Sequence, residues 1–267
     1  MVVERISRAD DPRLATFRGV RDPELVRARR QFIAEGRLVV QRVIEHERVR
    51  VHTVLVNEAA LAQLEPVLAK ASADTAVFVC APTVFVELTG HDIHRGCLAL
   101  ADRPSELTLD EAIRTANTIV VLEQVANADN VGAVFRHAAA FGCGAVVLSP
   151  GCCDPLYRKA IRTSMGAVLR VPCAMASPWP AALAHIRQAG FAIALLTPRG
   201  EALALDAFVH ARPTRVALVA GAEGTGLSAE AESHADARVR IPISDDVDSL
   251  NVATAVAIAL YELSRRA

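Results

Sequence analysis

Short runs of β-branched and aliphatic residues recur along the chain, separated by segments in which apolar residues follow helical spacing. Such runs are typical of buried strands in parallel sheets. In the second half of the chain the expected strands are Thr118 to Leu122, Ala145 to Leu148, Phe191 to Thr197, Val216 to Ala220 and Ala237 to Ile241. A helix is expected to start at Ser177 or Pro178 and to end at Gly190, and a long alanine-rich helix to run from about Leu250. This alternation predicts an α/β domain.

The first hundred residues show the same alternation of strands and helices. The expected elements are a helix at Arg37 to Glu45, strands at Val51 to Val56 and Thr75 to Cys80, the start of a helix at Val84 to Leu88, and a strand at Cys97 to Ala101. The polar stretch from Asp102 to Asp110 then interrupts the apolar pattern. A chain of 267 residues with 52% hydrophobic content is long enough for two cores. We therefore predict two domains, residues 1–105 and 106–267.

Three separated segments follow expected strands with polar, glycine-containing sequence. The first, Asn127 to Gly142, reads N-A-D-N-V-G-A-V-F-R-H-A-A-A-F-G. Asn127, Asp129 or Asn130 can cap the helix that this pattern predicts. Asn130 and Arg136 fall near one side of that helix, where they and the N-terminal amide groups can converge on an anion. A capped helix with one solvated arginine is the alternative interpretation.

The second segment continues the strand Val216 to Ala220 into G-A-E-G-T-G-L-S. Its glycines at 221, 224 and 226 permit positive φ and close approach of the backbone to a flat ligand. Glu223 places an acid at the carboxyl end of a strand, where open α/β sheets bind ligands. The segment is neither a P-loop nor the G-x-G-x-x-G dinucleotide signature. A glycine turn with a surface glutamate is the alternative.

The third segment, I-P-I-S-D-D-V-D-S-L-N from Ile241, leads into the long apolar helix. Ser249 and Asn251 bracket Leu250, so they would present two polar groups at the start of that helix. The alternative is that Ser249 is only the N-cap of the helix. The alanine-rich helix surface would then be ordinary core.

Taken together, these segments resemble the three motifs of the SpoU (TrmH-like) RNA 2′-O-ribose methyltransferases of the SPOUT superfamily. The resemblance rests on Asn130 followed by Arg136, on G-x-E-x-x-G-L from Gly221, and on I-P followed by S-L-N-V from Ser249. The motifs occur in the family's order and are far more specific jointly than singly.

The resemblance implies a doubly wound α/β domain with a parallel sheet, in which the C-terminal segment is threaded into a deep trefoil knot. Threaded chains are otherwise nearly absent from proteins. The hydrophobic periodicity of the sequence by itself does not predict the knot. The family binds S-adenosylmethionine in the knot and works as a homodimer through this domain. Carried over by motif, the cofactor-binding residues are Thr197, Gly221, Ile241 and Leu250. The catalytic and substrate-positioning residues are Asn130, Arg136, Glu223, Ser249 and Asn251.

The implied reaction is methyl transfer to a ribose 2′-hydroxyl of RNA. The sulfonium methyl of the cofactor is already activated, so the protein must place the 2′-oxygen in line at about 3 Å and help it lose a proton. Because a guanidinium stays protonated in proteins, we assign Arg136 to gripping the neighbouring phosphate and stabilising negative charge on oxygen. Asn130, Ser249 and Asn251 would orient ribose and cofactor. Glu223 is expected mainly to order its loop, which leaves the general base open.

Two basic regions are candidates for RNA contact. Arg158, Lys159 and Arg162 resemble the family's R/K-x-x-R-x-S-x-G stretch and would contact the RNA backbone, in addition to Arg136. Residues 1–50 are rich in arginine, which offers forked donors to phosphate and planes that stack on bases. A solvated basic face is the alternative for both regions.

The N-terminal region resembles the small, ribosomal-protein-like α/β substrate-binding domain that precedes the knot in many SpoU enzymes. F-I-A-E-G-R-L-V-V at Phe32 to Val40 and H-R-G-C-L-A at His94 to Ala99 match its landmarks. The presence of this domain favours ribosomal RNA over tRNA as the substrate. A tRNA 2′-O-methyltransferase is the alternative.

The chain departs from the family pattern in and beside the third motif. Ile243 stands where methionine is commoner, and Ala253 where serine is frequent. Asp245, Asp246 and Asp248 put three acids before the S-L-N motif. These acids should repel phosphate, so we expect the loop to face the partner subunit or to exclude wrong substrates.

Composition narrows the classes of protein further. A net charge of −1 argues against a protein that coats nucleic acid by bulk electrostatics. The six cysteines include no C-x-x-C, and Cys152 and Cys153 are adjacent, which suits neither zinc nor a disulfide framework. Reduced thiols and no metal site are expected. The N-terminus lacks the apolar core of a signal peptide, and no apolar stretch suffices to cross a membrane. We expect a cytoplasmic protein without a membrane partner.

Two other functional classes are consistent with parts of the sequence. A cofactor-binding or RNA-binding relative without turnover would be expected to lose some of the five polar site positions, yet all five are present. A nucleotide-dependent α/β enzyme would need one of the phosphate-binding signatures, which are missing. Cofactor turnover on RNA distinguishes the methyltransferase from the non-catalytic relative.

Overall fold

The chain forms two compact units in the computed structural model, which describes residues 2–19, 21–89, 96–198, 201–211 and 214–265. Unit 1 comprises Met1–Ser105 and Leu156–Leu169, and unit 2 comprises Glu106–Pro155 and Arg170–Ala267. The sequence assigned Leu156–Leu169 to the C-terminal domain, whereas it packs with the N-terminal residues. The reason is packing, since the helix Arg158–Thr163 within this segment lies against the strand Gln31–Glu35 of the N-terminal residues.

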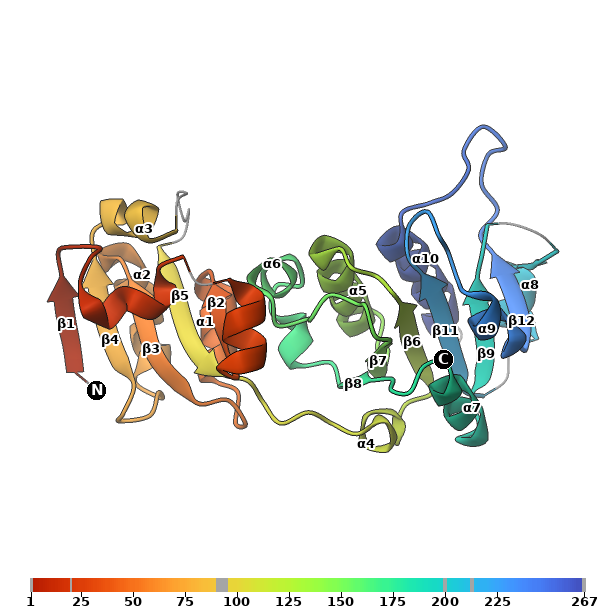
Figure 1. Cartoon of the computed structure of the whole chain (residues 1–267), viewed down its shortest axis with the longest axis horizontal. Helices are drawn as coiled ribbons and strands as arrows, with labels where there is room; N and C mark the ends of the chain where they lie inside the picture. Colours follow the sequence, from red (N-terminus) through yellow and green to blue (C-terminus); the bar gives the residue numbers. More distant parts are fainter. Residues whose placement is uncertain (1, 20, 90–95, 199–200, 212–213, 266–267) are drawn as a thin grey trace. The chain divides into compact units, whose positions relative to one another are not determined.

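Unit 1 is built on a mixed five-stranded sheet of order β1-β4-β3-β5-β2 (Figure 1). The strands β1, β4 and β3 are mutually parallel, and β5 is antiparallel to β3 and β2. The strands are β1 (Val2–Ile6), β2 (Gln31–Glu35), β3 (Val51–Val56), β4 (Ala76–Cys80) and β5 (Cys97–Asp102). The helical elements are η1 (Pro12–Phe17), η2 (Glu24–Ala28), α1 (Arg37–Ile44), α2 (Glu58–Leu68), α3 (Pro82–Thr89), α6 (Arg158–Thr163) and η3 (Ala167–Leu169).

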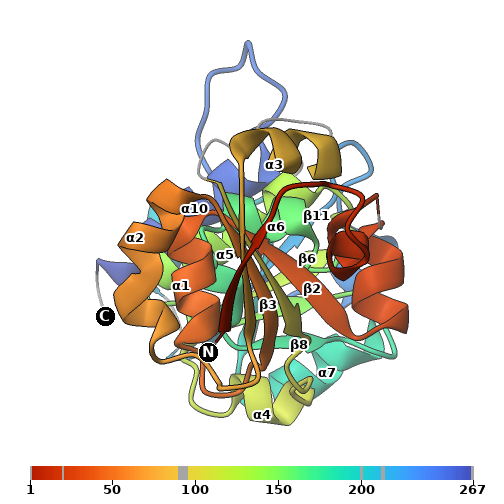
Figure 2. The ribbon, with the colours of Figure 1, turned by 90° about the vertical axis from the view of Figure 1, so that its left-hand side faces the viewer.

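Helical elements cover both faces of this sheet. On one face Ile33, Leu55 and Phe78 pack with Phe17 of η1 and Phe85 of α3. On the other face α1 and α2 lie side by side (Figure 2). The predicted strand Val51 to Val56 matches β3, whereas the sequence pattern did not predict β1 or α2. Of the predicted landmark at 94–99, the first two residues lie outside the described part of the chain.

Unit 2 is built on a seven-stranded sheet of order β10-β12-β9-β11-β6-β7-β8, in which every pair of neighbours is parallel. The strands are β6 (Thr118–Glu123), β7 (Ala145–Leu148), β8 (Cys173–Met175), β9 (Ala192–Leu196), β10 (Leu203–Ala204), β11 (Val216–Gly221) and β12 (Ala237–Arg240). The helices are α4 (Leu109–Ile113), α5 (Ala128–Ala140), α7 (Ala181–Gln188), α8 (Leu205–His210), α9 (Ala229–Ser233) and α10 (Val252–Ser264).

Helices pack on both faces of this parallel sheet, which confirms the doubly wound α/β class. Residues of α4, α7 and α9 share a buried cluster with Ile119, Val121 and Val219 of the central strands. The other face carries α5 and α10, which pack against each other and against β7 and β11, while α8 packs on α10. All five predicted strands of this unit are present. Helix α7 begins at Ala181, later than predicted, and Gly190 follows it with φ +88° as the expected C′ glycine. The deep knot stays a prediction.

Parallel pairing brings the three motifs to one edge of the sheet. The motifs follow β6, β11 and β12, and the carboxyl ends of parallel strands share an edge. Strands β6 and β11 are direct neighbours, with Glu123 opposite Gly221 in the ladder. A long irregular segment, residues 241–251, joins β12 to α10 and extends away from the sheet (Figure 1). The candidate site therefore lies at this edge of the sheet.

Candidate active site

Helix α5 follows β6 and carries Asn130 in its first turn, near the edge of the sheet where β6 ends. Its N-cap is Asn127, whose side chain accepts a hydrogen bond from the amide of Asp129 at 2.8 Å. Capping by Asn127 leaves Asn130 within the first turn, where it is 6% exposed. A buried amide side chain needs partners, and Asn130 finds one in the third motif.

Asn251 joins the three motifs through hydrogen bonds. Its Nδ2 donates to Asn130 Oδ1 at 2.9 Å and to Glu223 Oε1 at 2.7 Å. Its Oδ1 accepts from the amides of Ala253 at 2.9 Å and Thr254 at 3.2 Å, so Asn251 is the N-cap of α10. These bonds use both amide hydrogens and both acceptor positions of the side chain. Asn251 therefore fixes its neighbours rather than offering free groups to a ligand.

Ser249 and Arg136 are placed differently from the hydrogen-bonded residues. Both are exposed. Within the described residues, neither side chain forms a hydrogen bond or an ion pair. Because Asn251 caps α10, the alternative that Ser249 is merely its N-cap is wrong. Both side chains are accordingly available to a ligand.

The glycine-rich loop, residues 222–227 between β11 and the N-cap of α9, is folded against itself. The amide of Gly226 donates to the carbonyl of Ala222 at 3.0 Å, and Gly224 and Gly226 have φ of +89° and +71°. A Cβ on Gly221 would lie 2.4 Å from the carbonyl carbon and oxygen of Gly226. The close approach at Gly221 within the chain is thus made by the loop's own backbone.

His137, next to Arg136 on α5, ties that helix to α10. Its Nδ1 lies 3.1 Å from the carbonyl oxygen of Ala253. Since a carbonyl oxygen can only accept, Nδ1 carries the proton in this contact. Burial, together with the positive charge of Arg136, lowers the pKa of His137 from its ordinary value of 6.5. This contact gives His137 a structural role between the two helices.

The candidate cofactor-binding residues follow three adjacent strands. Thr197 follows β9, Gly221 ends β11 and Ile241 follows β12, and these strands are neighbours in the order β12-β9-β11. Leu250 precedes the cap of α10. All four residues are partly exposed. The amide of Thr197 is bound to the carbonyl of Val239 at 3.0 Å. The arrangement fits a flat, polar cofactor held largely by main-chain groups.

The basic segment at 158–162 is engaged within unit 1. Arg158 donates from its Nε to Asp22 Oδ1 at 2.8 Å and from its backbone amide to Asp22 Oδ2 at 3.0 Å. Arg162 forms an ion pair with Glu35 at 3.3 Å. Lys159 is exposed. The predicted RNA contacts of these residues stay a prediction, and any such contact by the two arginines competes with these carboxylates.

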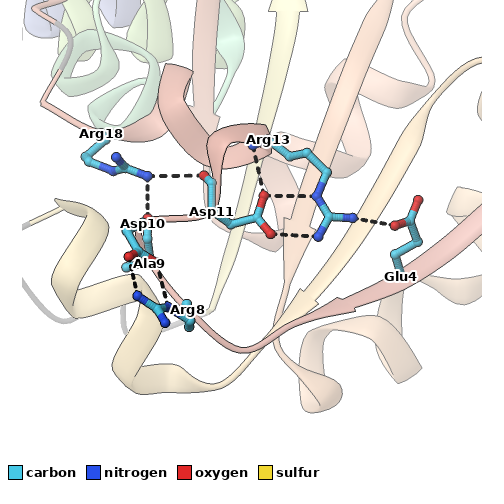
Figure 3. Close-up of polar contacts among 7 residues, drawn as sticks. All are labelled: Glu4, Arg8, Ala9, Asp10, Asp11, Arg13 and Arg18. Atoms are coloured by element: carbon cyan, nitrogen blue, oxygen red, sulfur yellow. Dashed lines mark hydrogen bonds and ion pairs between the residues drawn. The ribbon is translucent and has the colours of Figure 1, made fainter.

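Several N-terminal arginines are likewise paired (Figure 3). Arg8 contacts Asp10 at 2.5 Å, and Arg13 bonds to Asp11 at 2.6 Å. Arg18 donates to the carbonyl oxygen of Ala9 at 2.6 Å. In contrast, no hydrogen bond or ion pair among the described residues engages the guanidinium groups of Arg21, Arg27 and Arg48. The arginine-rich region therefore contains both neutralised and available positive charges.

Three further observations bear on the expected class of protein. No helix in the described part of the chain is long and apolar enough to cross a membrane. The described residues contain no cluster of histidine, cysteine or acidic side chains suited to a metal ion. No disulfide links the six cysteines.

Comparison with known proteins gives consistent matches. The SpoU rRNA Methylase family matches residues 117–261. An uncharacterized tRNA/rRNA methyltransferase of Mycobacterium tuberculosis is 41% identical over 98% of this chain and 92% of its own length. The 23S rRNA (guanosine-2′-O-)-methyltransferase RlmB of Acinetobacter baylyi is 33% identical over 67% of this chain and 74% of its own length.

Solved structures of whole chains are also similar. The AdoMet-bound rRNA methyltransferase from Sinorhizobium meliloti has a TM-score of 0.85 and 25% identity, covering 99% of this chain and 98% of that one. An RNA 2′-O ribose methyltransferase has a TM-score of 0.82 and 31% identity, covering 98% of both chains. The matches confirm the predicted family and the S-adenosylmethionine-dependent RNA methylation that it implies. The chain belongs to the SpoU rRNA Methylase family.

Proposed function

We propose that this enzyme methylates a ribose 2′-hydroxyl in ribosomal RNA and that it acts as a homodimer. The observation that supports the site most directly is the hydrogen-bonded chain from Asn130 through Asn251 to Glu223, which unites all three motifs. Ribosomal RNA is favoured over tRNA by the N-terminal unit and by the full-length match to an rRNA methyltransferase. The bound S-adenosylmethionine would supply the activated methyl group.

The residues of the site divide the remaining work. Arg136 is exposed in the C-terminal half of α5, and its fixed positive charge would grip the phosphate next to the acceptor ribose and stabilise negative charge on the 2′-oxygen. Ser249 would donate to or accept from the ribose. Asn251 holds the backbone at the start of α10, and its amide group fixes the side chains of Asn130 and Glu223. Among the catalytic candidates, Arg136 and Ser249 are therefore the ones proposed to touch RNA.

Identifying the atom that receives the methyl group tests this function. Purified protein should transfer labelled methyl from S-adenosylmethionine to ribosomal RNA fragments, and not to the same sequence with a 2′-deoxyribose at the mapped nucleotide. Equal labelling of the deoxy substrate would show that a base is the acceptor. A tRNA pool serves as the second arm, because preferential labelling of tRNA would support the alternative substrate.

The proposed dimer contact lies on α5 and α10. Tyr261 of α10 is 47% exposed and packs edge to face on Phe141, with ring centroids 5.9 Å apart. Ala139 and Ala140, which precede Phe141, are also exposed. Aromatic side chains such as that of Tyr261 are enriched in the cores of protein interfaces. Sedimentation of Tyr261→Glu should then show monomers, whereas an unchanged dimer would place the contact elsewhere.

A further inference from the structure

Glu123, the last residue of β6, is a buried carboxylate to which the proposed reaction gives no task. It is 1% exposed. Its Oε1 accepts from Trp179 Nε1 at 2.7 Å and from Ser228 Oγ at 2.6 Å, and its Oε2 accepts from the amide of Ser228 at 2.9 Å. A carboxylate is costly to bury unless donors satisfy it. The three donors therefore satisfy the buried carboxylate of Glu123.

The cluster holds both ends of the glycine-rich loop. Ser228 follows the loop directly and caps α9, where its Oγ accepts from the amide of Ala231 at 3.1 Å. At the start of the loop, Gly221 pairs with Glu123 in the parallel ladder. The backbone of Glu123 thus positions the start of the loop at Gly221, and its side chain fixes the end of the loop at Ser228.

We infer that Glu123 is a positioning residue for the active site, acting through this loop on Glu223. Glycines at 221, 224 and 226 make the loop intrinsically permissive. Anchoring the exit at Ser228 restricts the positions open to Glu223, and Glu223 in turn accepts the hydrogen bond from Asn251. The inference rests on the proposed function, since it assigns a task within the same site.

The clamp needs both side-chain oxygens of Glu123 as hydrogen-bond acceptors. Both oxygens face donors, so an amide at this position would direct its NH₂ group against another donor. Glu123→Gln therefore keeps the shape of the side chain and loses at least one hydrogen bond. Ser228→Ala removes only the hydroxyl donor and keeps the backbone donor. Glu111, a carboxylate that accepts from Thr108 in the capping box of α4, provides a matched control.

Loop order is measurable without any substrate. In Glu123→Gln, the amides of residues 222–228 should exchange hydrogen about tenfold faster or more than in the parent chain, the scale of losing a hydrogen bond to a charged group. Trp179 is the single tryptophan of the chain and donates to Glu123. The wavelength of tryptophan fluorescence emission should therefore shift in the same variant. Glu111→Gln should leave both readouts unchanged. Unchanged loop exchange in folded Glu123→Gln overturns the inference.

Turnover distinguishes a positioning role from a merely structural one. Glu123→Gln should lower kcat about tenfold or more, and adding it to Glu223→Ala, which removes the acceptor for Asn251, should cause little further loss, because both substitutions break the same path from the loop to Asn251. Additive losses overturn the inference. Should Glu123→Gln fail to fold, Ser228→Ala undergoes both measurements. If the parent chain transfers no methyl to RNA, the proposed function fails, while hydrogen exchange still decides the role of Glu123.

Discussion

Arg136 differs from Asn130, Glu223 and Asn251 because its side chain has no hydrogen-bond or ion-pair partner among the described residues. Its charge is accordingly free to act on a bound substrate. Arg136→Ala should retain S-adenosylmethionine affinity within about tenfold and lower turnover about 10²-fold, the scale of removing one preorganised electrostatic interaction. Calorimetry and methyl transfer measure the two quantities, with the exposed Arg114 substituted as a control. Abolished cofactor binding in a folded variant would place Arg136 in the cofactor pocket instead.

His137 makes stability depend on pH. Burial lowers its pKa below 6.5, so on acidification the unfolded chain takes up the proton first. Its contribution is complete above about pH 6.5 and is lost as pH falls toward the lowered pKa of the folded state. His137→Asn keeps a donor near Ala253 and removes the titration. Urea denaturation at about pH 7.5 and pH 5.5 should show a smaller acid-induced loss in this variant than in the parent chain. Equal losses would refute the prediction.

Among the structural elements, the loop after β11 depends on two different properties of glycine. At Gly221 a side chain would collide with the backbone of Gly226, whereas at Gly224 there is open space and the requirement is φ of +89°. Gly221→Ala should therefore destabilise the protein by about 1–3 kcal/mol through overpacking and reduce turnover strongly. Gly224→Ala should cost only about 1–2 kcal/mol for its left-handed backbone. Denaturant unfolding and turnover of the two variants, measured side by side, test this order. A turnover loss in Gly224→Ala as large as in Gly221→Ala would contradict it.

For the molecule as a whole, we expect the available arginines of unit 1 to contribute to RNA binding. Deleting residues 1–105 would expose the buried face of Leu156–Leu169, so substitution within the full chain is the cleaner experiment. Replacing Arg21, Arg27 and Arg48 by glutamine should weaken RNA affinity. It should also flatten the slope of log affinity against log salt by about 0.7 to 0.9 for each phosphate that an arginine no longer neutralises.

The paired arginines provide the control for that measurement. Arg8, Arg13 and Arg18 carry the same charge but are already bound to acids or to a carbonyl oxygen (Figure 3). Their replacement by glutamine should change the salt slope less. Filter binding at several salt concentrations gives both slopes. Identical slopes for the two triple variants and the parent chain would assign RNA recognition to unit 2.

The parallel sheet, the order of the motifs and the family could all be predicted from the amino-acid pattern. Strands buried on both faces must be apolar throughout, so runs such as Ala145 to Leu148 predict β7 without knowledge of their neighbours. The three motifs could be located in the sequence because each of them follows an apolar run that predicts a strand. Local capping was less determined, since Ser249 and Asn251 are equally suitable N-caps by residue type.

Which polar residues meet could be learned only from the folded chain. Asn251 reaches Asn130 across 121 residues and Glu223 across 28, and Glu123 reaches Ser228 across 105. Arg158 finds Asp22 across 136 residues, which turns an apparently solvated basic face into part of unit 1. Hydrogen bonds and ion pairs of this kind leave no periodic pattern, because periodicity reports only which face of an element is buried. The partner of a buried polar group is set by the packing of distant elements.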